Sequence, residues 1–230
     1  MQIRILSGGA AQGLVNALAA QFKAQTGCGI DGTFGAVGAM RDRLLGGAPA
    51  DLLILTRALI DELTRQGHVA PDSAVDIGTV LTAIAVRSRD PAPDVGDAAS
   101  LRAALLAAGE TYFPDPKLAT AGIHFAGVLD RLGIAAEVAA RLKTFPNGAT
   151  AMRALAASNG QRPIGCTQVT EILNTPGVRL VAPLPDGFRL ATVYTAAVAA
   201  KAARPDEARQ LAALLSATET REVRERAGFA

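Results

Sequence analysis

The chain has 230 residues, a formal net charge of +2 and a hydrophobic fraction of 50%, but only 4% of its residues are aromatic. This length suits one large domain or two lobes of about 100 residues, with alanine, leucine and valine filling the core. The small net charge and the scattered basic residues argue against a nucleic-acid partner. Two distant cysteines and two histidines lack metal-ligand spacing, so we expect neither a metal nor a cofactor.

Strand and helix patterns alternate along most of the chain, which is typical of a doubly wound α/β protein. The first strand leads into a helix with Leu14, Leu18 and Phe22 at helical spacing, and Gly27 is its expected end. The further predicted strands lie at 29–34, 51–55, 79–86, 111–113, 163–166 and 189–199. Predicted helices include 100–108, 120–132, 135–142 and 149–157, and two amphipathic helices close the chain.

Two long β-rich runs, 79–86 and 189–199, flank a self-contained middle block. This pattern predicts two lobes, each a sheet flanked by helices, connected by two crossing strands. We assign residues 1–82 plus 190–230 to lobe one and residues 83–189 to lobe two, and we expect the ligand in the cleft between them. A single doubly wound sheet is the alternative.

No apolar run reaches the roughly 18 residues needed to cross a bilayer, so we expect no membrane insertion. Met1 leads directly into the first predicted strand, without the basic and apolar regions of a secretory signal. Two localisations therefore stay open. The protein is cytoplasmic if Met1 is native, and periplasmic if a signal peptide was removed.

Small residues follow a strand and open a helix at three places, 7–13, 33–40 and 119–123. The first N–H groups of a helix lack intrahelical acceptors, and together with the helix dipole they bind anions. Three such helix starts in one modest chain predict a site for a small acidic ligand.

Four motifs carry a resemblance to a known family. They are Gly46-Gly47-Ala48-Pro49-Ala50-Asp51-Leu52-Leu53-Ile54, Phe34-Gly35-Ala36-Val37-Gly38, Asp115-Pro116 with Ala121-Gly122-Ile123-His124, and Gly228-Phe229. Through them nearly the whole chain resembles the molybdate-binding family of periplasmic solute-binding proteins. The resemblance implies the type II periplasmic binding protein fold and, for a transport role, an ABC transporter membrane component as partner.

The oxyanion pocket of that family is altered in this chain. By position, two serines of the family fall on Ala10 and Val37, and a tyrosine falls on Gln168. The main-chain donors that the resemblance implies at Thr56 and Thr150 are retained, since every residue except proline has an N–H. Each lost charge-assisted hydrogen bond contributes roughly 1.5–3 kcal/mol, so we expect molybdate and tungstate to be poor ligands.

Apolar walls beside anion-binding helix starts suit a small organic acid, such as a di- or tricarboxylate. Arg57 is either a bidentate carboxylate clamp or a solvated residue at a helix start. The predicted ligand-binding residues are Ser7, Gly8, Gly9, Ala10, Ala36, Val37, Thr56, Arg57, Thr120, Ala121, Thr150 and Gln168.

Two functions are compatible with this pocket. The preferred one is solute binding, and the alternative is isomerisation of an unsaturated tricarboxylic acid, because some relatives of the family resemble aconitate isomerases. His124 is the candidate base for that alternative, since the dipole of its helix favours a neutral imidazole, although core packing also explains it. Lys117, Asp115, Tyr112 and Cys166 are weaker candidates. No catalytic constellation is visible, so binding is preferred.

Overall fold

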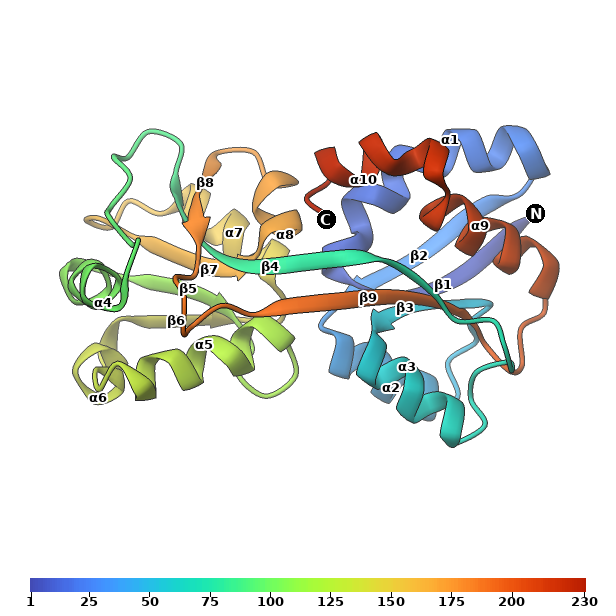
Figure 1. Ribbon diagram of the computed structural model, residues 1–230, viewed down its shortest axis with the longest axis horizontal. Coiled ribbons are helices and arrows are strands. Elements are labelled where there is room, and N and C mark those ends of the chain that lie inside the picture. Colours follow the sequence, from blue (N-terminus) through green and yellow to red (C-terminus); the bar gives the residue numbers. More distant parts are fainter. The chain divides into compact units, whose positions relative to one another are not determined.

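The computed structural model describes all 230 residues and divides into two compact units (Figure 1). Unit 1 comprises Met1–Val80 and Thr192–Ala230, and unit 2 comprises Leu81–Ala191. The chain passes from unit 1 to unit 2 within strand β4 (Val75–Arg87) and returns at the start of strand β9 (Ala191–Val198). The fold is mixed α/β, as the sequence predicted.

Unit 1 is built on a sheet with the strand order β2-β1-β3-β9-β4. Strands β1 (Gln2–Gly8), β2 (Gly29–Gly35) and β3 (Leu52–Thr56) are parallel, and β9 pairs antiparallel with β3. Its helices are α1 (Gln12–Thr26), α2 (Val37–Leu45), α3 (Arg57–Arg65), α9 (Pro205–Ser216) and α10 (Arg221–Arg226), with 3-10 turns η1 (Gly9–Ala11) and η3 (Thr218–Thr220). Helices α1, α9 and α10 lie together on one face of this sheet, and α2 and α3 lie on the other (Figure 1).

The apolar pattern of the sequence explains this packing. Every residue of Leu52–Leu55 is buried, which is typical of a parallel strand covered on both faces. Leu14, Leu18 and Phe22 are buried on one side of α1, and the helix ends at Gly27 in the left-handed conformation (φ 70°). The prediction for this helix is confirmed.

Asp51 is a buried carboxylate immediately before β3. It accepts hydrogen bonds from the N–H groups of Arg4 (2.7 Å), Ala203 (2.8 Å) and Arg204 (3.0 Å). It therefore ties β1 and the segment that precedes α9 to the central strand of unit 1. This contact explains an acidic residue in the motif at 46–54.

In unit 2, β4 pairs antiparallel with β7 (Ile164–Gln168) and with β8 (Val178–Pro183). Strands β5 (Thr111–Pro114) and β6 (Leu142–Phe145) extend the sheet parallel to β7. The helices of this unit are α4 (Ala98–Ala107), α5 (Thr120–Arg131), α6 (Ala135–Val138), α7 (Gly148–Ala157) and α8 (Val169–Leu173), with a 3-10 turn η2 (Ala139–Arg141).

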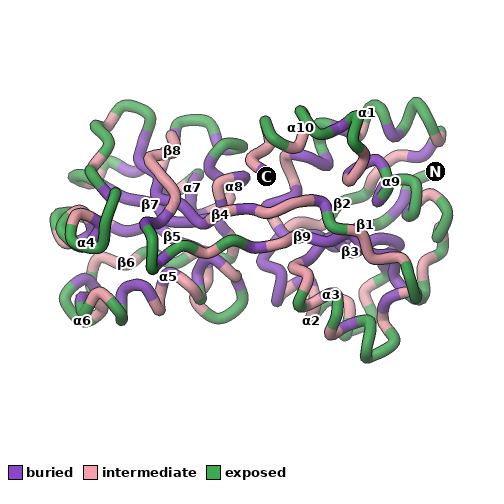
Figure 2. The backbone as a smooth tube through the Cα atoms, viewed as in Figure 1, coloured by how far each residue is buried: buried purple, intermediate pink, exposed green.

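The sheet of unit 2 separates two cores; its strands β5 and β7 are buried, whereas β6 and β8 are only partly buried (Figure 2). Ile84 and Cys166 belong to the core formed with α4 and α5, which includes Phe125. Ala83 and Ala85 belong to the core formed with α7 and α8. Because side chains alternate along a strand, these memberships show which face each strand residue occupies.

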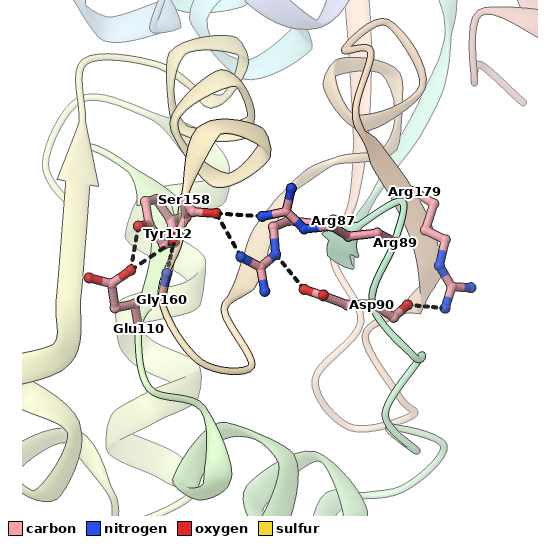
Figure 3. Close-up of polar contacts among 8 residues, drawn as sticks. All are labelled: Arg87, Arg89, Asp90, Glu110, Tyr112, Ser158, Gly160 and Arg179. Carbon is pink, nitrogen blue, oxygen red and sulfur yellow. Dashed lines mark hydrogen bonds and ion pairs between the residues drawn. The ribbon is translucent and has the colours of Figure 1, made fainter.

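A polar network fixes the loop after α7 in unit 2 (Figure 3). Arg87 is buried and donates to Asp90 (2.5 Å) and to the carbonyl of Ser158 (2.6 Å). The hydroxyl of Ser158 donates to Glu110 (3.0 Å), which also accepts from the Tyr112 hydroxyl (2.6 Å). The network ties β4, through Arg87, and β5, through Tyr112, to the loop after α7.

None of the helices combines the length and the hydropathy that a membrane-spanning segment requires.

We expect Asp51→Ala to lower the free energy of unfolding by about 2–4 kcal/mol, because three main-chain donors lose a charged acceptor. Urea denaturation checks this expectation. Asp31→Ala, at an exposed position of β2, is the control and should change stability by less than about 0.5 kcal/mol. Equal stability of the two variants would contradict the clamp assigned to Asp51.

Candidate functional site

The carboxyl ends of the parallel strands in unit 1 place three helix starts along one edge of the sheet. Strand β1 leads into η1 and α1 at Gly8, β2 leads into α2 at Ala36, and β3 leads into α3 at Thr56. Neither Gly8 nor Ala36 supplies a side-chain cap. The N–H groups of Gly9, Ala10, Val37 and Gly38 precede the first intrahelical bonds, so this edge offers main-chain donors.

At the α3 start, the protein itself pairs one main-chain donor and the nearby guanidinium of Arg57. The Thr56 hydroxyl accepts a hydrogen bond from the Leu59 N–H (3.4 Å). Arg57 pairs with Asp76 (2.6 Å) and, more distantly, with Asp61 (3.8 Å). Desolvation raises the pKa of Asp76, but hydrogen bonds from Arg57 and Thr195 outweigh it and leave this pKa below its ordinary value. The guanidinium of Arg57 is therefore held by carboxylates of the protein, and we do not include it in the donor set.

The wall beside the unit 1 donors is apolar and aromatic. A Cβ atom added at Gly8 would lie 2.8 Å from Val37 Cγ1 and 3.0 Å from Tyr194 Cε1, so both side chains pack on the main chain there. Tyr194 is buried opposite Thr56 in the β3–β9 ladder and packs edge-on against Phe229. Sequence reasoning missed Tyr194, because only the register of β9 places it at this edge.

Ser7 lies at the same edge, but its hydroxyl is bonded to the main chain. It is fully buried in β1, and its hydroxyl donates to the carbonyl of Gly8 (2.9 Å). Ala10 and Ala36 are buried and add no polar atom. Ser7, Ala10 and Ala36 therefore add no side-chain donor for a ligand at this edge.

In unit 2 the parallel strands β5, β6 and β7 lead into α5, α7 and α8 along one edge. The α7 start is closed. Asn147 accepts hydrogen bonds from the N–H (2.9 Å) and the hydroxyl (3.0 Å) of Thr150. Thr150 was expected to offer its N–H to the ligand, but that donor is used inside the protein, because asparagine is a favoured N-cap residue.

Glu171 places a carboxylate of the protein itself at the α7 start. It accepts hydrogen bonds from the Thr167 hydroxyl (2.5 Å) and from the main chain of Ala149, Gln168 and Gly148. A Cβ atom at Gly148 would overlap the Glu171 carboxylate, so a larger residue there would displace that side chain. Burial raises the pKa of Glu171 although these hydrogen bonds oppose the shift. Glu171 was missed in the sequence analysis. The spacing was a usable signal, because Glu171 follows the α8 N-cap residue Gln168 by three positions, as the acidic residue of a capping box does.

The α5 start remains open. Its N-cap residue, Ala119, has no side-chain cap, and the N–H groups of Thr120 and Ala121 precede the first intrahelical bond. The preceding turn is closed by Asp115, whose carboxylate accepts from the N–H groups of Lys117 (2.7 Å) and Leu118 (3.0 Å). Asp115 is thus a turn residue.

Three buried side chains of unit 2 have polar atoms without partners. These atoms are both amide atoms of Gln168 and the hydroxyls of Thr82 and Thr170. Gln168 is only 3% exposed and stands opposite Thr82 in the β4–β7 ladder. Since a buried polar group normally has a hydrogen-bond partner, this pair marks a place where a ligand can supply one.

The candidate bases differ in what the structure leaves available for proton transfer. His124 Nε2 lies 2.7 Å from the carbonyl oxygen of Phe188, so this nitrogen must carry the proton and only Nδ1 can accept one. Burial and the hydrogen bond to Glu110 raise the pKa of Tyr112. Burial also raises the pKa of the Cys166 thiol. No three His, Cys, Asp or Glu side chains are grouped so that they could hold a metal ion.

Comparison with known proteins identifies relatives over the whole chain. Residues 3–230 match the family model of bacterial extracellular solute-binding proteins. An aconitate isomerase from Pseudomonas sp. is 27% identical over 235 residues, which cover 99% of this chain and 87% of the isomerase.

Solved structures show the same fold at lower identity. The periplasmic molybdate-binding protein of Azotobacter vinelandii has a TM-score of 0.80 at 19% identity, with 99% of this chain and 98% of that chain covered. The sulfate-binding protein SubI of Mycobacterium tuberculosis has a TM-score of 0.78 at 20% identity, with coverages of 100% and 86%. The expected type II periplasmic binding protein fold is confirmed.

We expect the stabilising effect of Glu171 to depend on pH. Because burial raises its folded-state pKa, the folded protein binds the proton more tightly than the unfolded chain does. Wild-type stability relative to Glu171→Gln should therefore be greatest below the unfolded pKa of about 4.3 and should fall as the pH rises through the folded pKa. Urea denaturation between pH 4 and pH 8 measures this difference.

The exposed Glu219→Gln variant controls for the loss of a carboxylate elsewhere. A stability difference between wild type and Glu171→Gln that grows with rising pH would show that the sign of the pKa shift is wrong.

Proposed function

This chain belongs to the family of bacterial extracellular solute-binding proteins, and we propose that its solute is a small organic di- or tricarboxylate. The observation that carries the proposal is the chemistry of the open helix starts. Gly8, Ala36 and Ala119 leave main-chain N–H groups free, while Ala10 and Val37 supply no hydroxyl. We propose that main-chain donors of this kind bind the carboxylates of the ligand.

The apolar wall favours a carbon skeleton over a compact oxyanion. A tetrahedral ion needs donors on all sides, and each missing charge-assisted hydrogen bond costs roughly 1.5–3 kcal/mol. The Val37 side chain and the ring carbon Cε1 of Tyr194 instead lie next to the donors, where they pack against Gly8. A di- or tricarboxylate combines anionic ends with methylene groups that match such a wall.

The proposed role entails a membrane partner. A solute-binding protein that serves transport delivers its ligand to the membrane component of an ABC transporter, and we propose such a component as the partner of this chain. The nearly balanced charge of the chain supports protein contacts rather than nucleic-acid binding.

We expect di- and tricarboxylates to raise the melting temperature of the protein and to bind in isothermal titration calorimetry, whereas molybdate, tungstate and sulfate should bind at least 100-fold more weakly. Bound ligand stabilises the folded state in proportion to ln(1 + [L]/Kd), so the two readouts should agree. Nanomolar binding of tungstate would overturn the proposal.

We expect Gly9→Val to weaken carboxylate binding by at least 100-fold with little loss of stability, because a branched side chain would stand over the first donors of η1. Gly127→Val is the matched control, because a Cβ atom at Gly127 on α5 meets no atom within 4 Å. Retained affinity in Gly9→Val would mean that this helix start does not contact the ligand.

Isomerisation of an unsaturated tricarboxylic acid is the second candidate, and the 27% identical aconitate isomerase favours it. In such a reaction a base removes a proton from one carbon, the double bond shifts, and a proton returns to the other end of the allylic system. His124 Nδ1 is the only ring nitrogen free to act, since Nε2 is engaged with Phe188.

If the protein is an isomerase, incubation with an unsaturated tricarboxylate in deuterated water should introduce deuterium into the substrate, which NMR detects. His124→Ala should then abolish exchange while ligand affinity is retained, and His68→Ala in unit 1 should leave exchange unchanged. Absence of exchange in the wild-type protein would exclude this function, and full activity of His124→Ala would exclude His124 as the base.

A further inference from the structure

The unpartnered amide of Gln168 carries information about the ligand beyond its negative charge. Both amide atoms of this side chain are buried without a hydrogen-bond partner. The hydroxyls of Thr82 and Thr170 are also unpartnered, so neither of them reaches the amide. A buried polar group left unsatisfied is costly, so the missing partner is expected to come from a ligand.

The register of β4 and β7 shows which face of the sheet Gln168 occupies. Ile84 and Cys166 are a registered pair in the core formed with α5. Thr82 and Gln168 are the registered pair two residues further along, so their side chains lie on that same face. Gln168 also ends β7, at the edge where α5 begins. Gln168 and the open start of α5 therefore belong to one face and one edge of unit 2.

On the opposite face of the sheet, the side chain at the end of β7 has a partner within the protein. Thr167 lies between Gln168 and Cys166 and alternates to the other side, where its hydroxyl donates to Glu171. Asn147 and Glu171 together occupy the donors at the α7 start. A ligand of unit 2 is thus expected on the α5 face, where Thr120, Ala121 and Gln168 are available.

A carboxamide imposes a condition that a carboxylate alone does not meet. Its nitrogen donates two hydrogen bonds, and its oxygen only accepts them. A carboxylate, molybdate or sulfate satisfies the nitrogen and the main-chain donors of α5 but offers no proton to the amide oxygen. Exchanging the two amide atoms by rotating the side chain does not change this balance.

We infer that the ligand is a hydroxy acid, whose hydroxyl donates to the Gln168 amide oxygen while its carboxylates accept from the main chain. This inference rests on the proposed carboxylate-binding function and narrows its ligand class. The inference favours acids that carry a hydroxyl group over acids, saturated or unsaturated, whose only polar groups are carboxylates.

The experiment compares pairs of acids that differ by one hydroxyl, malate with succinate and citrate with tricarballylate, by isothermal titration calorimetry at neutral pH. In the wild-type protein the hydroxylated member of at least one pair should bind about tenfold more tightly or better, which is the usual effect of leaving a buried acceptor unpaired. Gln168→Met keeps the length of the side chain and removes its polar atoms, so the preference should shrink to about twofold or less.

Gln161→Met, at an exposed position of the same unit, is the matched control and should keep the wild-type preference. Equal affinity within both pairs, or an unchanged preference in Gln168→Met, would overturn this inference while leaving carboxylate binding intact. Tighter binding of aspartate than of malate would overturn it as well, because an ammonium group would then be the donor. Binding of none of these acids would overturn the proposed carboxylate ligand itself.

Discussion

The main-chain N–H groups at helix starts must find acceptors, and this constraint organises both units. Parallel strands bring several helix starts to one edge, where the donors of neighbouring helices accumulate. The protein satisfies some of them internally, through Thr56 at α3 and through Asn147 and Glu171 at α7. It leaves those at η1, α2 and α5 without side-chain caps. What remains open after this internal pairing defines what a ligand can contact.

The fold class followed from the sequence because apolar spacing is a local property. The predicted helix with Leu14, Leu18 and Phe22 buries these three residues, and the run 51–55 forms a fully covered strand. Strands β6 and β8 were not predicted. Both are short and only partly buried, so their sequences lack the continuous apolar run that identifies a central strand. Their positions are set by pairing with β5 and β4, which is tertiary information.

For the candidate site, too, only the features that depend on local sequence were predictable. Small residues without a capping side chain identify an open helix start locally, and this reasoning located η1, α2 and α5. It failed for Thr150 because a local signal was missed: Asn147, three residues earlier, caps α7. Glu171 of α8 fills the rest of that start, and its place there depends on the packing of α8 beside α7. The environment of Arg57 likewise depends on Asp76, which lies on another element. Closure of a donor by a distant side chain leaves little trace in the local sequence.

On the proposed function, this division between main-chain and side-chain groups would let one scaffold bind different ligands. Main-chain donors are fixed by the fold and survive any substitution except proline, whereas the side chains beside them are free to vary. Ala10 and Val37 carry no hydroxyl donor, and Val37 lies against Gly8 at the end of β1. In the function proposed above, the Gln168 amide oxygen adds an acceptor beside the main-chain donors of α5. On that proposal the fold supplies affinity for negative charge, and a few side chains at the strand ends select which anion is bound.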